Sequence, residues 1–416
     1  MNNIQNHKRN KTALDFFLLS VIFFQVGRIT RVEFDIQSLG NGLRIIGFII
    51  LVYSLLIQFS SKNRPHLNRI MVFLILWNTI NILFSIFSTG LNLTRTFGED
   101  SYFFNLLLPY LLLYNVQSFD IKKVFKYCIA FALLSLFVVA VNYEYILNAN
   151  NINTITEAVD AENMTLYFAQ LPLMWSIPAT LIFMNTQFVK NKHVIIALAT
   201  VMLATMFSMA FGRRSTSFYG FAFLAVSAYT YIKNPYISVR KRRNFKIAVF
   251  LFLIVAITIS TSHFSFLMER GMEDSRTGIN EAFYADMNTI DYIFGRGLNG
   301  TYYDPLIIFE AFNFQRPGLE TGYLNIILHA GLLYLIPYLL LCLTSVYYGL
   351  FKSRNTFVKS FAVYILVNTL MLYIGSYPEF NLRFFLLWIG ILLCNNPLIR
   401  SMNNDEIKSF YKLSAR

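Results

Sequence analysis

Long apolar runs, separated by short polar or charged stretches, dominate the pattern along the chain. Runs of roughly 17 to 25 apolar residues can cross the hydrocarbon core of a bilayer as single helices. Lipid offers no partner to backbone polar groups, so such runs predict helices rather than open strands. About twelve spans are expected, near residues 13–27, 39–59, 69–90, 101–117, 124–147, 165–187, 194–211, 216–232, 247–262, 321–349, 360–376 and 382–399.

The breaks between the runs are short, with one exception. Residues 263–319 are too polar to lie in lipid and form the longest break. The pattern predicts an all-α, polytopic integral membrane protein with one large extracytoplasmic loop. Transmembrane helices 1–9 are expected within 1–262, the loop over 263–319, helices 10–12 within 320–400 and a cytoplasmic tail over 401–416. The first run lacks a small-residue cleavage site after it, which favours an uncleaved signal anchor.

Composition supports this class and excludes others. Of 416 residues, 56% are apolar and 14% are charged, whereas soluble domains carry about 25% charged residues. A soluble globular enzyme and a disordered protein are therefore excluded. The three cysteines all lie inside apolar runs, which favours small buried side chains over a disulfide framework or a metal site.

The net charge is +13, and lysine and arginine are distributed differently between the two predicted sides of the membrane. With the N-terminus in the cytoplasm, every lysine falls in an inner loop or tail, as the positive-inside rule expects. Both termini are then cytoplasmic. The run Arg240–Arg243 is explained by this rule without nucleic acid. The basic residues outside or embedded are all arginines: Arg28, Arg31, Arg44, Arg95, Arg213, Arg214, Arg270, Arg276, Arg296, Arg316 and Arg383.

An outer set made only of arginine points to anion binding. The guanidinium group is planar, permanently charged and able to hold phosphate or carboxylate in bidentate fashion. Pairing with the outer acidic residues is the alternative explanation. Arg213 and Arg214 stand in a very short outer hairpin, where they would bind a phosphate or extend to lipid head groups. Within the large loop, the candidates are Arg270, Arg276 and Arg296.

Two further residues could carry proton transfer. Glu320 stands where the tenth span begins and is a candidate general base, although an acid there also complements a helix dipole. His329 lies nine residues further along, roughly 13 Å down a helix, as a second candidate or as a satisfied buried polar group. No metal-ligand spacing or complete nucleotide motif is present, so neither a metal nor a cofactor is expected.

Over about residues 205–335, the order of these motifs resembles the O-antigen polymerase (Wzy) and O-antigen ligase (WaaL) superfamily. The resemblance is carried by Gly212-Arg213-Arg214-Ser215, by Ser275-Arg276 with the helix that follows, and by Gly295-Arg296-Gly297. It is also carried by Glu320-Thr321-Gly322-Tyr323-Leu324 with the downstream Gly331-Leu332-Leu333.

This resemblance implies a glycosyltransferase that joins undecaprenyl-diphosphate-linked repeat units of an O-antigen, capsule or exopolysaccharide at the outer face of the bacterial plasma membrane. Arginines 213, 214 and 276 would stabilise the diphosphate leaving group without metal, and Glu320 or His329 would take the acceptor proton. The implied partners are these lipid-linked oligosaccharides and membrane lipids. A chain-length regulator and a flippase are further candidates, and nucleic acid is not expected.

The chain departs from the family pattern at one point, and two alternative functions remain. Ligases and many polymerases carry a His-Asn pair where this chain has Glu320-Thr321, which weakens the ligase assignment. The alternative functions are an O-antigen ligase and a lipid-linked oligosaccharide flippase. The large outer loop and the lack of an internal repeat argue against the flippase.

Overall fold

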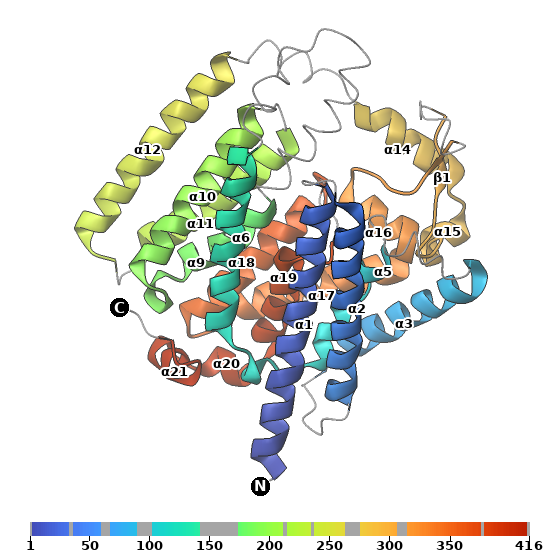
Figure 1. Cartoon of the computed structure of the whole chain (residues 1–416), viewed down its shortest axis with the longest axis horizontal. Coiled ribbons are helices and arrows are strands. Elements are labelled where there is room, and N and C mark those ends of the chain that lie inside the picture. Colours follow the sequence, from blue (N-terminus) through green and yellow to red (C-terminus); the bar gives the residue numbers. More distant parts are fainter. Residues whose placement is uncertain are drawn as a thin grey trace.

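The computed structural model describes residues 2–32, 36–59, 67–89, 102–141, 174–210, 214–233, 237–262, 275–305, 314–375 and 378–413. Over these ranges the chain is almost entirely helical, with one two-stranded antiparallel sheet (Figure 1). The predicted all-α class is confirmed.

The longer helices and the two strands are α1 (Asn2–Val32), α2 (Gln37–Phe59), α3 (Arg69–Thr89), α6 (Ile121–Val141), α10 (Asn191–Ala210), α11 (Arg214–Lys233), α12 (Val239–Ser262), α14 (Ser275–Asp286), β1 (Tyr302–Tyr303), β2 (Gln315–Arg316), α16 (Gly322–Ala330), α17 (Leu332–Phe351), α18 (Thr356–Met371) and α19 (Leu382–Asn395). The shorter elements are α5 (Tyr102–Asn105), η1 (Leu108–Leu113), η2 (Val116–Ser118), η4 (Ile177–Ala179), α9 (Thr180–Met184), η5 (Thr186–Phe188), α15 (Thr289–Phe294), α20 (Pro397–Ser401) and α21 (Asn404–Phe410).

Several helices have the length and composition of membrane spans. Five of those described can cross a bilayer: Arg9–Arg31, Gln37–Phe59, Arg69–Phe87, Asn191–Met209 and Leu332–Phe351. Four apolar helices are shorter: Phe103–Leu113, Met174–Met184, Thr356–Met371 and Leu382–Asn395. A helical membrane protein is therefore indicated, but about twelve full-length spans are not confirmed.

Some predicted spans are interrupted, and two of them show the cause. The run 101–117 forms α5, η1 and η2 in place of one α-helix, with Pro109 in the first turn of η1. Proline has no backbone N–H and is poorly tolerated inside a helix. The run 321–349 divides at Gly331, which has φ of 72° and separates α16 from α17. A positive φ cannot be continued as a right-handed helix.

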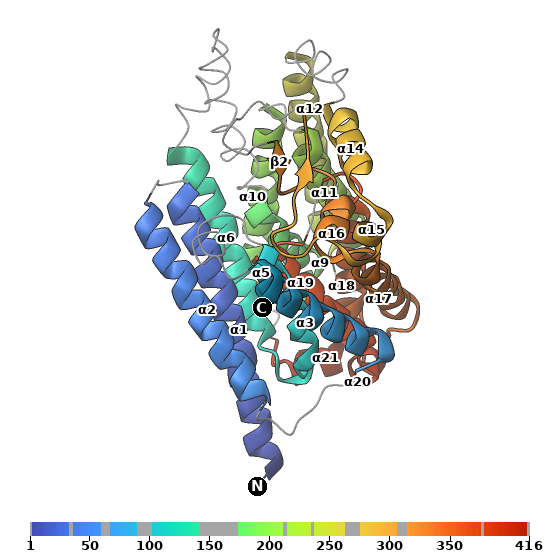
Figure 2. The same ribbon diagram turned by 90° about the vertical axis from the view of Figure 1, so that its right-hand side faces the viewer.

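Helices α1 and α2 form a closely packed antiparallel pair, which lies side by side in Figures 1 and 2. Small residues recur every seventh position along α2, at Gly40, Gly47 and Ser54. A Cβ on Gly40 would lie 2.7 Å from the Gly27 carbonyl oxygen, so the two backbones touch there. Small residues commonly bring helices together in membranes, where burial of apolar surface supplies no driving force.

Helix α19 forms the centre of the bundle. Every residue from Leu382 to Cys394 is buried, which is the environment that a helix apolar on all sides requires. Helices α1, α17 and α18 pack around it (Figure 1). The start of α19 therefore lies within protein.

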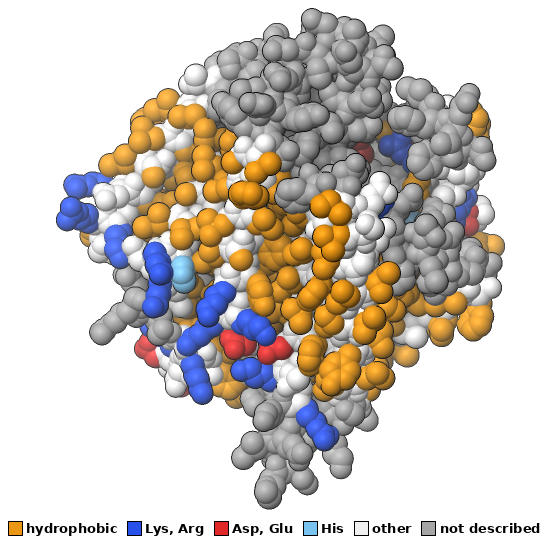
Figure 3. Space-filling view, viewed as in Figure 1, with side chains coloured by type: hydrophobic (Ala, Val, Ile, Leu, Met, Phe, Trp, Pro, Cys, Tyr) orange, Lys and Arg blue, Asp and Glu red, His pale blue; other side chains and the backbone are white. Residues whose placement is uncertain are grey.

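The two ends of the molecule differ in character. Helices α14 and α15 and strand β1 lie to the upper right in Figure 1, whereas α1 begins at the bottom and α20 and α21 lie low. Figure 3 shows Lys and Arg side chains gathered low on one face, below a broad apolar area. Ion pairs Lys11–Asp120 (3.5 Å) and Lys123–Asp15 (3.4 Å) join the N-terminal half of α1 to the start of α6. Which end faces the cytoplasm stays a prediction from the charge pattern.

Candidate functional site

The glycine turn of the large loop docks on the break between α16 and α17. Gly295 and Gly297 have φ of 76° and 80°, in the left-handed region that favours glycine. The Arg296 backbone N–H donates to the Leu328 carbonyl oxygen at 2.6 Å. A Cβ on Gly295 would lie 2.7 Å from the backbone nitrogens of both Ala330 and Gly331. The close approach therefore needs glycine.

One face of α3 contacts both the glycine turn and the break between α16 and α17. Trp77, Asn81 and Ser85 are spaced four residues apart, so they share a face of the helix. Trp77 Nε1 donates to the Ala330 carbonyl oxygen and Asn81 Nδ2 donates to the His329 carbonyl oxygen, both at 2.9 Å. The Ser85 hydroxyl accepts the Leu298 N–H at 2.9 Å. These bonds attach the loop and the broken helix to the same support.

His329 connects the two ends of the large loop. It is 2% exposed, with Nδ1 2.9 Å from the Gly297 carbonyl oxygen and Nε2 3.1 Å from that of Pro317. Carbonyl oxygens only accept, and neutral imidazole has one N–H, so both contacts are hydrogen bonds only in the doubly protonated ring. The ring is thus engaged on both sides, which argues against its predicted role as the base.

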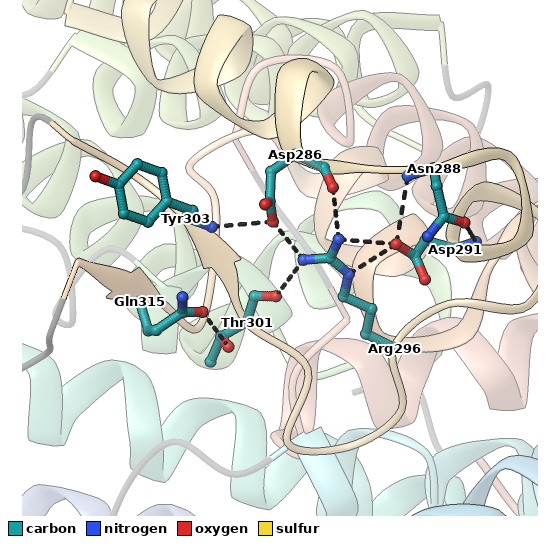
Figure 4. A network of polar contacts seen from close by, with 7 residues as sticks. All are labelled: Asp286, Asn288, Asp291, Arg296, Thr301, Tyr303 and Gln315. Carbon is teal, nitrogen blue, oxygen red and sulfur yellow. Dashed lines mark hydrogen bonds and ion pairs between the residues drawn. The ribbon is translucent and has the colours of Figure 1, made fainter.

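Arg296 is fully occupied by its own loop (Figure 4). Its Nε and Nη2 both donate to Asp291 Oδ2, at 3.0 and 2.8 Å. Its Nη1 donates to Asp286 Oδ2 and the Thr301 carbonyl oxygen, and its Nη2 to the Asp286 carbonyl oxygen. Guanidinium has five N–H donors, and all five are used. The diphosphate-binding role predicted for Arg296 is not supported by this geometry.

The environment of Arg296 keeps it charged. Burial alone lowers its pKa, but hydrogen bonds and charges from Asp291 and Asp286 outweigh that effect and raise the pKa. Helix α15 begins with a reciprocal capping box between Asn288 and Asp291, which places Asp291. The Tyr303 N–H donates to Asp286 Oδ2 at 3.0 Å and thereby joins the hairpin to the same network (Figure 4).

A polar cluster stands beside the start of α16. The sheet pairs Tyr302 with Arg316, and Arg316 Nη1 lies 2.9 Å from Oδ2 of the fully buried Asp304. The Tyr302 hydroxyl is also buried and has no hydrogen-bond partner. Burial raises the pKa of Tyr302, the Arg316 charge lowers it, and Asp304 and Glu320 raise it further. The hydroxyl therefore stays protonated in the folded protein.

Glu320 itself is exposed and directly precedes Thr321, the N-cap of α16. The helix begins where the sequence predicted. A solvent-accessible carboxylate in this position can accept a proton from a hydroxyl group that approaches from outside.

Three helices are connected near Glu320 through the end of α18 and the N-cap of α16. At the end of α18, the Met371 carbonyl oxygen accepts the Tyr219 hydroxyl of α11 at 2.9 Å. The next carbonyl, of Leu372, accepts the Tyr323 N–H of α16 at 3.3 Å. Helix α14 joins them, because the Thr321 hydroxyl lies 3.5 Å from Asn280 Oδ1. The second turns of α11 and α14 are thus connected to the first turn of α16 and to the end of α18.

Only some of the predicted arginines lie within the described residues. Arg214 is the first residue of α11 and Arg276 the second residue of α14, so both stand at these helix starts, but their side chains are not described. Arg213 and Arg270 lie outside the described residues.

Sequence reasoning missed the polar cluster of Tyr302, Asp304 and Arg316. Tyr302 and Asp304 were not singled out, and Arg316 was noted only among the outer arginines. The pair Tyr302-Tyr303, followed twelve residues later by Gln315-Arg316, is a weak strand signal, since tyrosine favours strands. Comparisons with protein-family models, curated proteins and solved structures found no match to this chain. Any function is therefore assigned from the residues and their geometry.

Proposed function

We propose that the protein is a polysaccharide polymerase. It joins undecaprenyl-diphosphate-linked oligosaccharide repeat units at the outer face of a bacterial plasma membrane. The observation that carries the proposal is that the N-terminal halves of α11 and α14 are connected to the start of α16, next to the exposed Glu320, through Tyr219, Asn280 and Thr321. Arg214 and Arg276 stand in the first turns of two of these helices.

The helix starts favour a phosphate ligand. Backbone N–H groups in the first turn of a helix have no partner within the helix, and the macrodipole adds partial positive charge there. Helix N-termini are therefore common binding sites for phosphate. Two of these three helices carry an arginine in the first turn, which suits a diphosphate better than a neutral sugar. No fixed metal ion is needed to balance charge in this scheme.

The reaction follows from this placement. The acceptor hydroxyl oxygen attacks the anomeric carbon of the donor sugar, and a carbon–oxygen bond forms. The bond between that carbon and the diphosphate oxygen breaks, and the electron pair leaves on undecaprenyl diphosphate. Glu320 takes the acceptor proton, and the arginines with the helix N-termini stabilise the diphosphate as its charge grows.

The test is complementation of a gene deletion. Glu320→Gln keeps the shape of the side chain but cannot take a proton, so we expect polymer to be lost and single repeat units to remain on the surface lipid. The matched control is Glu281→Gln, an exposed carboxylate on α14 that is expected to restore normal polymer. Immunoblots must show equal amounts of both variants.

The outcomes separate the alternative functions. A flippase would leave no repeat units outside the membrane when the gene is deleted. A ligase would leave lipid-linked polymer that is never transferred to its surface acceptor. Full polymer with Glu320→Gln would contradict the proposed base.

A further inference from the structure

Helix α15 exposes apolar side chains in a part of the chain that is otherwise polar. Ile290, Ile293 and Phe294 are 68%, 37% and 48% exposed. They are spaced three and four residues apart, so they share one face of this short helix. The acidic residue of α15, Asp291, is bonded through its carboxylate to Arg296. Helix α15 therefore contributes no free charge to this face.

The end of α15 contacts two helices that can cross a bilayer. The centre of the Phe294 ring lies 5.8 Å from the centre of the Trp77 ring of α3. The Ile293 carbonyl oxygen packs against Gly331, the N-cap of α17. Both α3 and α17 have the length and hydropathy of membrane spans. The apolar face of α15 therefore stands beside two candidate spans.

The contact with α3 indicates how deep α15 lies. Trp77 stands near the middle of the candidate span Arg69–Phe87, at most about 12 Å and 15 Å from its two ends at 1.5 Å per residue. Because α3 runs at an angle to α1 and α2 (Figures 1 and 2), the depth below the membrane surface is smaller than these lengths. The contact with α17 is at the first turn of the span Leu332–Phe351. Together the contacts place the end of α15 between the edge and the middle of the bilayer.

The exposed apolar surface of α15 continues on both neighbouring helices. On each of them, large exposed apolar side chains recur at intervals of four and three residues, as on a helix face turned to lipid. These residues are Leu76, Ile80 and Leu83 of α3, and Ile336, Leu340 and Leu343 of α17. A continuous apolar surface of this kind marks contact with a membrane or a protein. Its continuity with the candidate spans favours the membrane.

The backbone of α15 is suited to lipid, where unpaired polar groups are costly. The Asn288 side chain accepts the Asp291 N–H in the capping box at the start of the helix. At the other end, the Gly295 N–H donates to the Asp291 carbonyl oxygen at 2.8 Å. The next N–H, of Arg296, donates to the Leu328 carbonyl oxygen at 2.6 Å. Both ends of this short helix are therefore satisfied by protein groups.

We infer that Ile290, Ile293 and Phe294 are immersed in lipid acyl chains, in the leaflet on the side of the large loop. The large loop is then partly inserted in the bilayer, which differs from the expectation that all of residues 263–319 stay outside it. Acyl chains remove the three side chains from water and require no hydrogen bond from them. This inference holds whichever reaction the protein performs.

The test measures the surroundings of a spin label on the full-length protein in phosphatidylcholine nanodiscs. The label is attached to Ile290→Cys and, as a second position, to Ile293→Cys. The unsubstituted protein, whose described cysteines are buried, gives the labelling background. Collisions with oxygen, which enters lipid, are compared with collisions with a water-soluble nickel chelate. We expect the ratio of oxygen to nickel collisions to exceed that of a water-exposed position about fivefold or more, because hydrocarbon takes up apolar solutes and excludes polar ones.

Two labelled variants define the limits of this scale. Ile80→Cys lies on the exposed apolar face of α3 and represents lipid, whereas Glu281→Cys lies on an exposed position of α14 and represents water. A ratio at Ile290 close to that of Ile80 would support the inference. A ratio close to that of Glu281 would overturn it. Protection from both reagents would also overturn it and would show that protein, such as a second copy of the chain, covers α15. If one cysteine variant of α15 fails to fold, the other decides.

Discussion

Two regions of the molecule each contain an arginine that is partly or fully buried, and the surroundings of the two arginines differ. One region is the loop unit, which comprises α14, α15 and the β1–β2 hairpin, and the other is the bundle around α19. In the loop unit, Arg296 donates all five N–H groups and faces two carboxylates. In the bundle, Arg383 has an amide and a thioether as its polar partners and keeps Nη2 unpaired. The fully used donors identify Arg296 as a structural link within the loop unit, whereas Arg383 keeps a donor that no described residue accepts.

The largest effect is expected from a substitution at the contact between the loop unit and the break at Gly331. Gly331→Ala puts a Cβ against the Ile293 carbonyl oxygen at a residue with φ of 72°. Strain and overlap together should cost about 2–5 kcal/mol of folding free energy. The matched control is Gly42→Ala, where a Cβ would meet nothing within 4 Å. Thermal unfolding in nanodiscs should show a much lower Tm for the first variant alone, and equal Tm values would contradict the close docking.

A smaller effect is expected when the arginine is replaced. Arg296→Met removes the guanidinium and leaves Asp286 and Asp291 facing one another, 30% and 18% exposed. We expect about 2–3 kcal/mol of local destabilisation. Amide hydrogen exchange should become faster in α15 and the hairpin and stay unchanged in α19. Uniform exchange across the chain would show that the loop unit is not fastened in this way.

The smallest effect concerns the buried Tyr302 hydroxyl, which has no hydrogen-bond partner. Because burial raises the pKa of Tyr302, the folded protein keeps this hydroxyl protonated after the unfolded chain has begun to ionise. The stabilisation is complete below the ordinary tyrosine pKa of about 10 and is lost as the pH rises above it. Tyr302→Phe should match the wild type at pH 7 and exceed its stability by up to about 1 kcal/mol near pH 10.5. Parallel curves of Tm against pH would refute this.

Helix positions could be predicted where local pattern decides them. Helices α2 and α3 occupy Gln37–Phe59 and Arg69–Thr89, within two residues of the predicted spans. The break at Gly331 could not be predicted from periodicity, because its cause is Ile293, which approaches from the large loop. Local hydropathy does not encode such a contact.

The candidate site shows the same division. Glu320 could be placed at a helix start from the sequence, because the change from polar loop to apolar run is local. The pairing of Arg296 with Asp286 and Asp291 depends on how the loop folds back, which the sequence does not reveal. Arg296 was therefore predicted to bind phosphate. The surroundings of Arg383 come from Met174, Tyr219 and Asn368, far apart in the chain, so its burial was beyond sequence reasoning.

The fastening of the loop is made largely to main-chain atoms. His329 contacts the carbonyl oxygens of Gly297 and Pro317, and the Arg296 N–H reaches the Leu328 carbonyl oxygen. Carbonyl groups are present whatever side chain a residue carries. Substitutions of the side chains at Leu328 and Pro317 would therefore leave these acceptors in place, so the attachment of the loop tolerates sequence change there.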